Sequence, residues 1–346
     1  MKQFAELLLT WYREFGRHLP WRESRDPYRI WISEIILQQT RVEQGLAYYL
    51  RFVERFPDVA SLAEASLDEV MKYWQGLGYY SRARHLHEAA RSVQGVFPRT
   101  YEEVRALSGV GDYTAAAICS FAYDMPCAVV DGNVYRVLTR FFGIDRPIDS
   151  AAGKREVGQL ANELLSKEHP ADYNQAIMDF GALLCTPRQP QCAACPLSGG
   201  CRALEQQAVE AYPVKSHKTK VTDRYFHYIY VRAGAYTFIN KRCADDIWQG
   251  LYELPMVETA LPMGVEQLLQ SEAFSGFMAP GEQPQLRLLQ QGVKHQLSHR
   301  TIHASFFEVV LPEETRSFST CLKIPLAEVD NYAVPRLIHA FFEKYL

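Results

Sequence analysis

One stretch, from Leu107 to Asp131, constrains the fold of this chain more than any other. It begins LSGVG, which places Gly109 and Gly111 just before a run typical of a helix. Glycine permits positive φ and close backbone approach, so we expect a tight turn that leads into this helix. The free N–H groups of the turn and of the first helical turn would bind a phosphate and fix register on a nucleic acid. The alternative is a plain turn without a ligand.

Asp131 closes the same stretch. It follows the apolar residues 128–130 and precedes Gly132 and Asn133, after which a new helix is expected over 134–142. An aspartate directly before a helix is most often an N-cap. A carboxylate leaving apolar surroundings is also a candidate for catalysis, and the residues alone leave both interpretations open.

The composition fits a globular protein with one or two large domains. The chain has 346 residues, of which 48% are hydrophobic and 22% charged. No basic segment followed by an apolar run opens the sequence, and no apolar stretch approaches membrane-spanning length, so we expect a cytoplasmic protein without membrane association. The net charge of -3 argues mildly against a uniformly basic nucleic-acid binder but permits a local basic face.

Four of the eight cysteines crowd into one short segment, with the spacing Cys185-x6-Cys192-x2-Cys195-x5-Cys201. Clustering favours a metal site over disulfides. By ligand type alone, four thiolates suit zinc and an iron-sulfur centre equally well. The single Cys-x-x-Cys pair between two lone cysteines differs from the two knuckles of a zinc ribbon, and both kinds of centre stay open at this point.

Glu34 lies in an apolar helix expected to run from about Ile30 to Leu50. It is the only acid in the first turns of that helix and is followed by Ile35 and Ile36. A carboxyl bordered by isoleucines has a poorly solvated charged form, which is the condition for holding a proton near neutral pH. The alternative is the solvated flank of an amphipathic helix.

Together, the glycine hairpin, Asp131 downstream and the cysteine spacing resemble the helix-hairpin-helix DNA glycosylases of the endonuclease III superfamily, over roughly Trp11 to Cys201. Residues 33–40, SEIILQQT, resemble the general-acid segment of MutY-type adenine DNA glycosylases. The resemblance implies a mostly helical two-lobed domain with a [4Fe-4S] loop that is structural and docks DNA. It implies that Glu34 protonates adenine at N7 and that Asp131 stabilises or transiently captures the sugar.

The same resemblance implies several DNA contacts. Tyr79, in a Gly-Tyr-Tyr turn, would enter the base stack as a wedge, although packing at a bend is the alternative. Gln39 would be its intercalating or pairing-edge partner, and Gln175 would contact the extruded base. Lyase-type members carry a lysine where this chain has Tyr113, so we expect a monofunctional enzyme. Further candidate contacts from these motifs are Arg22, Thr40, Tyr113 and Asn133.

The sequence changes character after residue 208. We predict a glycosylase domain over 1–208, a linker over 209–222 and an α/β domain over 223–346, with paired strands near 225–231 and 236–242. Residues 247–255, IWQGLYELP, resemble the Nudix-like C-terminal domain of MutY proteins. The glutamate-rich metal helix of working Nudix hydrolases is absent after Pro255, so we expect a recognition module.

Residues 294–299, KHQLSH, resemble the Phe-Ser-His loop with which that family senses 8-oxoguanine. Leu297 replaces the phenylalanine, while Ser298 and His299 remain available for hydrogen bonds. We therefore expect a monomeric glycosylase that removes adenine opposite 8-oxoguanine or G from double-stranded DNA, associated with the nucleoid in a bacterium. The alternatives are an endonuclease III-type pyrimidine glycosylase with lyase activity, or a non-enzymatic iron-sulfur DNA-binding protein.

Overall fold

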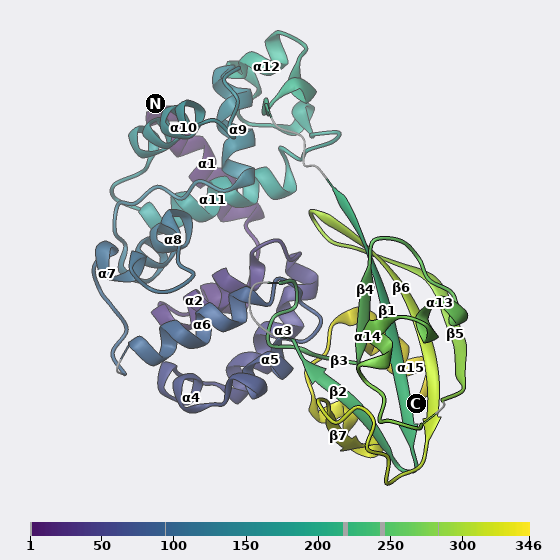
Figure 1. The fold of residues 1–346 in the computed structure, drawn as a ribbon. Coiled ribbons are helices and arrows are strands. Elements are labelled where there is room, and N and C mark those ends of the chain that lie inside the picture. Colours follow the sequence, from purple (N-terminus) through teal and green to yellow (C-terminus); the bar gives the residue numbers. More distant parts are fainter. Residues whose placement is uncertain (1, 94, 217–220, 243–245, 283) are drawn as a thin grey trace. The chain divides into compact units, whose positions relative to one another are not determined.

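The chain folds into two units, which the computed structural model describes over residues 2–93, 95–216, 221–242, 246–282 and 284–346 (Figure 1). The first unit comprises residues 1–64 and 85–218, and the second comprises 65–84 and 219–346. Part of the predicted linker, residues 217–220, lies outside the described residues. Among the residues that are described, no helix combines the length and the apolar character needed to cross a membrane.

The first unit is helical, as predicted. Buried residues of α1, α9, α10 and α11 form one core, while α2 packs against α3 and α8. Because α11 contacts both α8 and α9, it joins the two groups of helices. The helices of this region are α1 (Lys2–Phe15), α2 (Pro27–Leu37), α3 (Val42–Arg55), α4 (Val59–Glu64), α6 (Ser81–Ser92), α7 (Tyr101–Arg105), α8 (Asp112–Tyr123), α9 (Gly132–Phe142), α10 (Ala151–Leu164), α11 (Pro170–Leu183) and α12 (Arg202–Glu205).

The single helix expected over residues 30–50 was wrong. The chain forms α2 and α3 instead, with Gln38–Arg41 between them. Gln39 has a φ of 57°, a left-handed conformation that a right-handed helix cannot contain. The apolar periodicity continues through this turn, which is why it suggested one helix.

The second unit is an α/β domain, which confirms the predicted fold class. Its seven-stranded sheet has the order β3-β2-β1-β6-β5, with β4 paired to β1 and β7 paired to β2. The predicted pair of strands forms antiparallel. The elements are α5 (Leu67–Trp74), β1 (Thr222–Ala233), β2 (Tyr236–Lys241), β3 (Tyr252–Glu253), β4 (Met256–Thr259), α13 (Val265–Leu269), α14 (Glu272–Ser275), β5 (Leu286–Gln296), β6 (Arg300–Leu311), β7 (Leu322–Pro325) and α15 (Arg336–Tyr345).

Strand β1 is central and buried on both faces. Ile229 and Val231 share a core with Phe274 of α14, whereas the ring of Tyr230 meets Phe341 of α15 at 5.6 Å. Successive side chains of a strand point to opposite faces, so helices cover both sides of this sheet. A strand buried on both faces needs a nearly continuous apolar run, and residues 225–231 supply one.

Candidate active site

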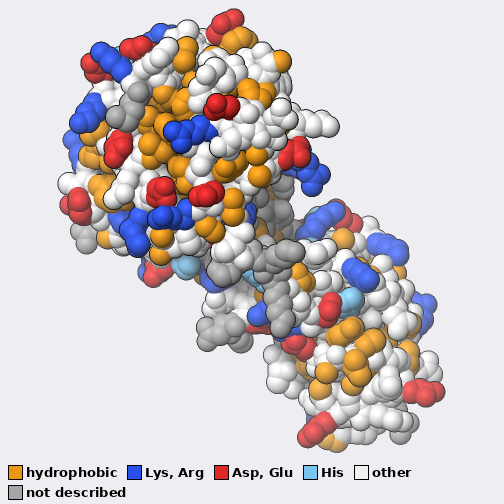
Figure 2. All heavy atoms as spheres, turned by 90° about the horizontal axis from the view of Figure 1, so that it is seen from above, with side chains coloured by type: hydrophobic (Ala, Val, Ile, Leu, Met, Phe, Trp, Pro, Cys, Tyr) orange, Lys and Arg blue, Asp and Glu red, His pale blue; other side chains and the backbone are white. Residues whose placement is uncertain are grey.

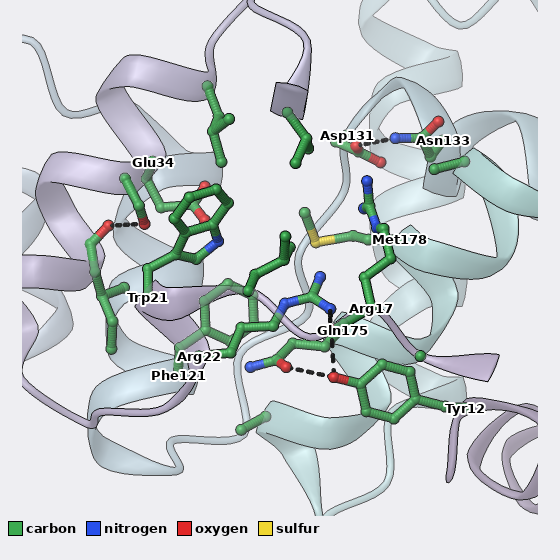
Figure 3. A pocket seen from close by; sticks show the side chains of 18 of the residues that line it. Tyr12, Arg17, Trp21, Arg22, Glu34, Phe121, Asp131, Asn133, Gln175 and Met178 are labelled. Carbon is green, nitrogen blue, oxygen red and sulfur yellow. Dashed lines mark hydrogen bonds between the residues drawn. The ribbon is translucent and has the colours of Figure 1, made fainter. Parts of the chain in front are cut away.

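A cavity of about 1290 Å³ lies within the first unit (Figure 3). Its walls come from α1, α2, the turn after α2, the start of α8, the loop before α9, and α11. Eight of the predicted site residues line it: Arg22, Glu34, Gln39, Thr40, Tyr113, Asp131, Asn133 and Gln175.

Glu34 reaches this cavity from the buried helix α2. Asp26 caps that helix by accepting a hydrogen bond from the N–H of Tyr28, and Pro27 occupies its first position. Glu34 is 6% exposed and accepts a 2.9 Å hydrogen bond from the hydroxyl of Tyr113. Burial raises the pKa of Glu34 to about 7, against the lowering effect of the Tyr113 hydrogen bond, and the charge of Asp131 raises it further. The carboxyl therefore holds its proton up to neutral pH.

Asp131 is the N-cap of α9, which confirms the N-cap role expected for an aspartate directly before a helix. One carboxylate oxygen accepts from the N–H of Val134 at 2.8 Å, and the other accepts from the side-chain amide of Asn133 at 2.7 Å. Burial raises the pKa of Asp131, and these two hydrogen bonds counteract part of that rise. Arg136 in turn donates a 2.8 Å hydrogen bond to the side-chain oxygen Oδ1 of Asn133. The carboxylate is held rigidly while it still lines the cavity.

The two acids face the same space from different segments (Figure 3). One is protonated near neutral pH and the other is held by donors that favour its anion. A proton donor and an anion in different environments are what the cleavage of a glycosidic bond through an oxocarbenium-like transition state requires.

A third carboxyl, that of Asp179, is fully buried beside the cavity. Arg22 donates to its two oxygens at 2.8 and 2.9 Å, and Arg17 donates to it from its side chain and its backbone. Two guanidinium groups compensate one buried charge, and they keep the pKa of Asp179 low against the effect of its burial. The predicted DNA contact Arg22 is therefore committed to an internal ion pair.

The remaining walls offer flat apolar surface and one amide. Trp21, Phe121 and Met178 line the cavity, as expected for a pocket that takes a planar heterocycle. The Gln175 carbonyl accepts a 2.6 Å hydrogen bond from the hydroxyl of Tyr12 (Figure 3).

The glycine hairpin forms between α7 and α8, and it is not among the residues that line the cavity. Gly109 has a φ of 75°, and a Cβ there would lie 2.7 Å from the Cβ of His85. Both the conformation and the close contact require glycine. Gly111 is the N-cap of α8 and, without a side chain, does not cap the N–H groups of the first helical turn.

In the second unit, the turn that carries Tyr79 and the loop between β5 and β6 come together. The Tyr79 hydroxyl shares a hydrogen bond with the hydroxyl of Ser298. Tyr79 is 45% exposed and has a φ of 46°, while His299 uses its carbonyl to accept from the N–H of Thr222. Two motifs assigned separate roles in the sequence are thus neighbours in one unit.

The four clustered cysteines lie in one loop after α11 and form no disulfide. Burial raises the pKa of Cys195, and the charges of the other three thiols raise it further, so the four lie near one another. Across the described ranges, no group of three or more His, Cys, Asp or Glu side chains is already arranged to hold a metal ion. The donor type and the shared loop suit an iron-sulfur cluster, which the loop would have to close around.

The sequence prediction missed Tyr12, Arg17 and Asp179. The Arg22–Asp179 pair spans 157 residues, and contacts of that range leave no local pattern. One signal was available, because Asp179 is a lone acid in the otherwise apolar end of α11, and a buried acid needs a cationic partner.

The surface of the first unit carries no uniformly basic field on the face drawn in Figure 2. Lysines and arginines stand in separate groups there, mixed with acidic side chains and apolar patches. This distribution agrees with the net charge of -3. Contacts to a polyanion would then depend on local groups of cations and on backbone N–H donors.

Comparison with known proteins identifies both halves of the chain. Residues 32–167 match the model of the HhH-GPD superfamily of base excision DNA repair proteins, and residues 227–344 match the NUDIX domain model. An adenine DNA glycosylase of Buchnera aphidicola (Baizongia pistaciae strain) is 31% identical over 314 residues, which cover 89% of this chain and 86% of the relative. The human adenine DNA glycosylase is 43% identical over 216 residues, 59% of this chain and 40% of the relative.

Two solved structures share the fold of a large part of this chain. A thermostable thymine-DNA glycosylase has a TM-score of 0.56 and 33% identity, and it covers 59% of this chain and 96% of its own. A complex of endonuclease III with DNA has a TM-score of 0.52 over 60% of this chain and 98% of its own. At 23% identity, the second likeness shows the fold alone.

Proposed function

This chain belongs to the family of adenine DNA glycosylases of base excision repair, and on that premise we propose that it removes adenine mispaired with 8-oxoguanine or G, with Glu34 as proton donor and Asp131 as the stabilising anion. The family reaction is the hydrolysis of an N-glycosyl bond, and DNA is the substrate. The base opposite the adenine and the roles of individual residues are our proposal.

The reaction follows from the environments of the two acids. Adenine leaves poorly as an anion, so protonation of N7 by Glu34 makes the departing base neutral while the bond between C1′ and N9 breaks. The sugar then carries positive charge, which the Asp131 carboxylate stabilises or briefly captures. Water adds to C1′ and completes the hydrolysis. Trp21 and Phe121 would flank the extruded base.

The observation that carries this proposal is the meeting of Glu34 and Asp131 at one cavity, with the pKa of Glu34 raised to about 7. Duplexes carrying A opposite 8-oxoguanine, G or T, treated with alkali after incubation, would reveal abasic sites. We expect strand breaks with 8-oxoguanine and G and few with T. Release of adenine from none of the three would contradict the proposal.

Asp131→Asn separates chemistry from structure. Asparagine is as good an N-cap as aspartate, so α9 should keep its first turn. The neutral amide cannot stabilise the sugar cation, and we expect excision to be abolished while DNA binding stays largely intact. A variant that cuts at nearly the wild-type rate would remove Asp131 from the mechanism.

We propose that the enzyme is monofunctional. Lyase activity needs an amine that forms an imine with the sugar, and Tyr113 occupies the corresponding position and donates to Glu34. Borohydride should therefore trap little protein on substrate DNA. Efficient trapping would favour the endonuclease III-type reaction.

We propose that Cys185, Cys192, Cys195 and Cys201 hold a [4Fe-4S] cluster that orders their loop for DNA docking. The support is the donor set, the mutual proximity of the thiols and the spacing. When bound, the cluster would supply structural crosslinking of the loop. Metal analysis of the purified protein should find about four irons per chain, and zinc in their place would overturn this assignment.

We propose that the second unit recognises the opposite base and is not a second active site. Tyr79 and Ser298 are neighbours within it, which supports a joint role for the wedge and the 8-oxoguanine loop. The proposed domains remain 1–208 for the glycosylase, 209–222 for the linker and 223–346 for recognition, with the segment 65–84 that carries Tyr79 belonging to the second unit. Ser298→Ala should lower the preference for A opposite 8-oxoguanine over A opposite G, and an unchanged preference would contradict this role.

A further inference from the structure

We propose that Tyr12 is a specificity-determining positioning residue, because it fixes the amide of Gln175 so that the NH₂ group of that amide, and not the oxygen, meets the extruded base. The inference rests on the proposed function, since it assumes that adenine occupies this cavity. Tyr12 lies on α1 and Gln175 lies on α11, and both line the cavity.

The contact between the two side chains decides the orientation of the amide. A glutamine amide can turn over, because its oxygen and its NH₂ group have nearly the same shape. Here the Tyr12 hydroxyl donates to Oε1 of Gln175 at 2.6 Å. Figure 3 shows the amide oxygen of Gln175 facing Tyr12 and the amide nitrogen pointing away from Tyr12.

Arg22 explains why the hydroxyl of Tyr12 donates to this amide. A guanidinium group carries only donors, and Nη1 of Arg22 lies 3.5 Å from the hydroxyl oxygen of Tyr12, at the outer limit of a hydrogen bond. The lone pairs of that oxygen therefore face the cation, and its proton is directed at Gln175. Asp179, whose carboxylate is fully buried, holds Arg22 in this place by accepting two hydrogen bonds from its guanidinium group.

The result is a fixed donor on the wall of the pocket. Within the described part of the chain, Nε2 of Gln175 has no hydrogen-bond partner of its own. In the proposed reaction Glu34 protonates N7. We therefore expect Gln175 to contact the six-membered ring, where N1 and N3 of adenine are hydrogen-bond acceptors. A donor at this place favours a ring nitrogen with a lone pair and disfavours one that carries a hydrogen.

Excision of base analogues by Tyr12→Phe tests the inference. Single-turnover rates would be measured for adenine, 1-deazaadenine and 3-deazaadenine opposite G, all of which keep N7. We expect wild type to excise one of the two analogues about tenfold more slowly than adenine, because one hydrogen bond is lost. In Tyr12→Phe the amide turns freely, so adenine should slow by a similar factor and the discrimination should fall to about twofold.

Tyr173→Phe is the matched control. Tyr173 is buried on the same helix, and its hydroxyl has no partner among the described residues, so its removal should change neither rate nor selectivity. In a Gln175→Leu background, Tyr12→Phe should have no further effect, because Tyr12 acts only through the amide. Melting temperatures of all variants would show that each is folded.

The excision rates of these variants distinguish three outcomes. Loss of analogue discrimination in Tyr12→Phe, with Tyr173→Phe unchanged, supports the inference. Wild-type discrimination retained in Tyr12→Phe, or an additive effect with Gln175→Leu, overturns it. Failure of the wild-type protein to release adenine from any duplex would instead refute the proposed function.

Discussion

The cavity of the first unit and the arginine cluster around Asp246 in the second unit treat carboxyl groups in opposite ways. In the first unit, Glu34 and Asp131 face a cavity and, among the described side chains, form no ion pair. In the second unit, Asp246 is paired with Arg224, Arg242 and Arg300. A carboxyl group without an ion-pair partner can donate a proton or stabilise a cation of the substrate. A carboxyl group paired with arginines instead stabilises the fold.

The pKa values express the same contrast. Burial dominates at Glu34 and raises the pKa of that carboxyl to about 7. Burial would also raise the pKa of Asp246, but the hydrogen bonds and charges of Arg224 and Arg242 lower it below the usual range. At these two acids, the cations within reach of the carboxyl group decide the direction in which its pKa moves.

The largest effect is expected from Glu34→Gln. The amide keeps the shape of the side chain but has no proton to transfer, so the single-turnover rate of adenine excision should fall about a thousandfold. Glu43→Gln is the control, because Glu43 lines the same cavity but is exposed. A loss of less than tenfold in Glu34→Gln would end the distinction between the two classes of acid.

Asp246→Asn should act on stability and not on chemistry. It leaves three arginines without their shared anion, and at 29% side-chain exposure we expect the free energy of unfolding to fall by about 2 kcal/mol, less than for a fully buried pair. Urea unfolding would measure this, with Glu266→Gln on the exposed side of α13 as control. A slower excision step in folded Asp246→Asn would show that the second unit takes part in the reaction.

The pH dependence of excision should report Glu34. A raised pKa means that the acid is protonated, and so active, below about 7 and is lost as the pH rises through that value. The single-turnover rate should therefore fall up to about tenfold per pH unit on the alkaline side. A rate that stays constant to pH 9 would show that Glu34 is not the proton donor.

Tyr113→Phe should produce the smallest change. Burial, the main cause of the raised pKa of Glu34, remains, while the hydrogen bond that lowers it is removed. The decrease of the single-turnover excision rate on the alkaline side should therefore begin at a higher pH. Tyr123→Phe is the control, because its hydroxyl bonds to the Pro98 carbonyl at the other end of α8. A decrease that begins at a lower pH would mean that the tyrosine supports the neutral form of Glu34.

Sequence reasoning succeeded where the physical constraint was local. The hairpin glycines, the cap at Asp131 and the apolar surroundings of Glu34 each depend on residues within a few positions. It failed at the turn over residues 38–41, since a left-handed residue such as Gln39 interrupts a helix without changing the apolar period. It also missed the link from Asp179 to Tyr12, because pairs across α1 and α11 depend on tertiary packing alone.

Gln39 and Tyr79 share one further property. Both were assigned to the distorted base stack, and both have left-handed backbone conformations that cost a residue with a side chain roughly 1 kcal/mol or more. Glycine at either position should therefore give a more heat-resistant protein that repairs DNA less well. The strained backbone at these two turns lowers the stability of the fold, and a use of both side chains on DNA would explain why glycine does not occupy either position.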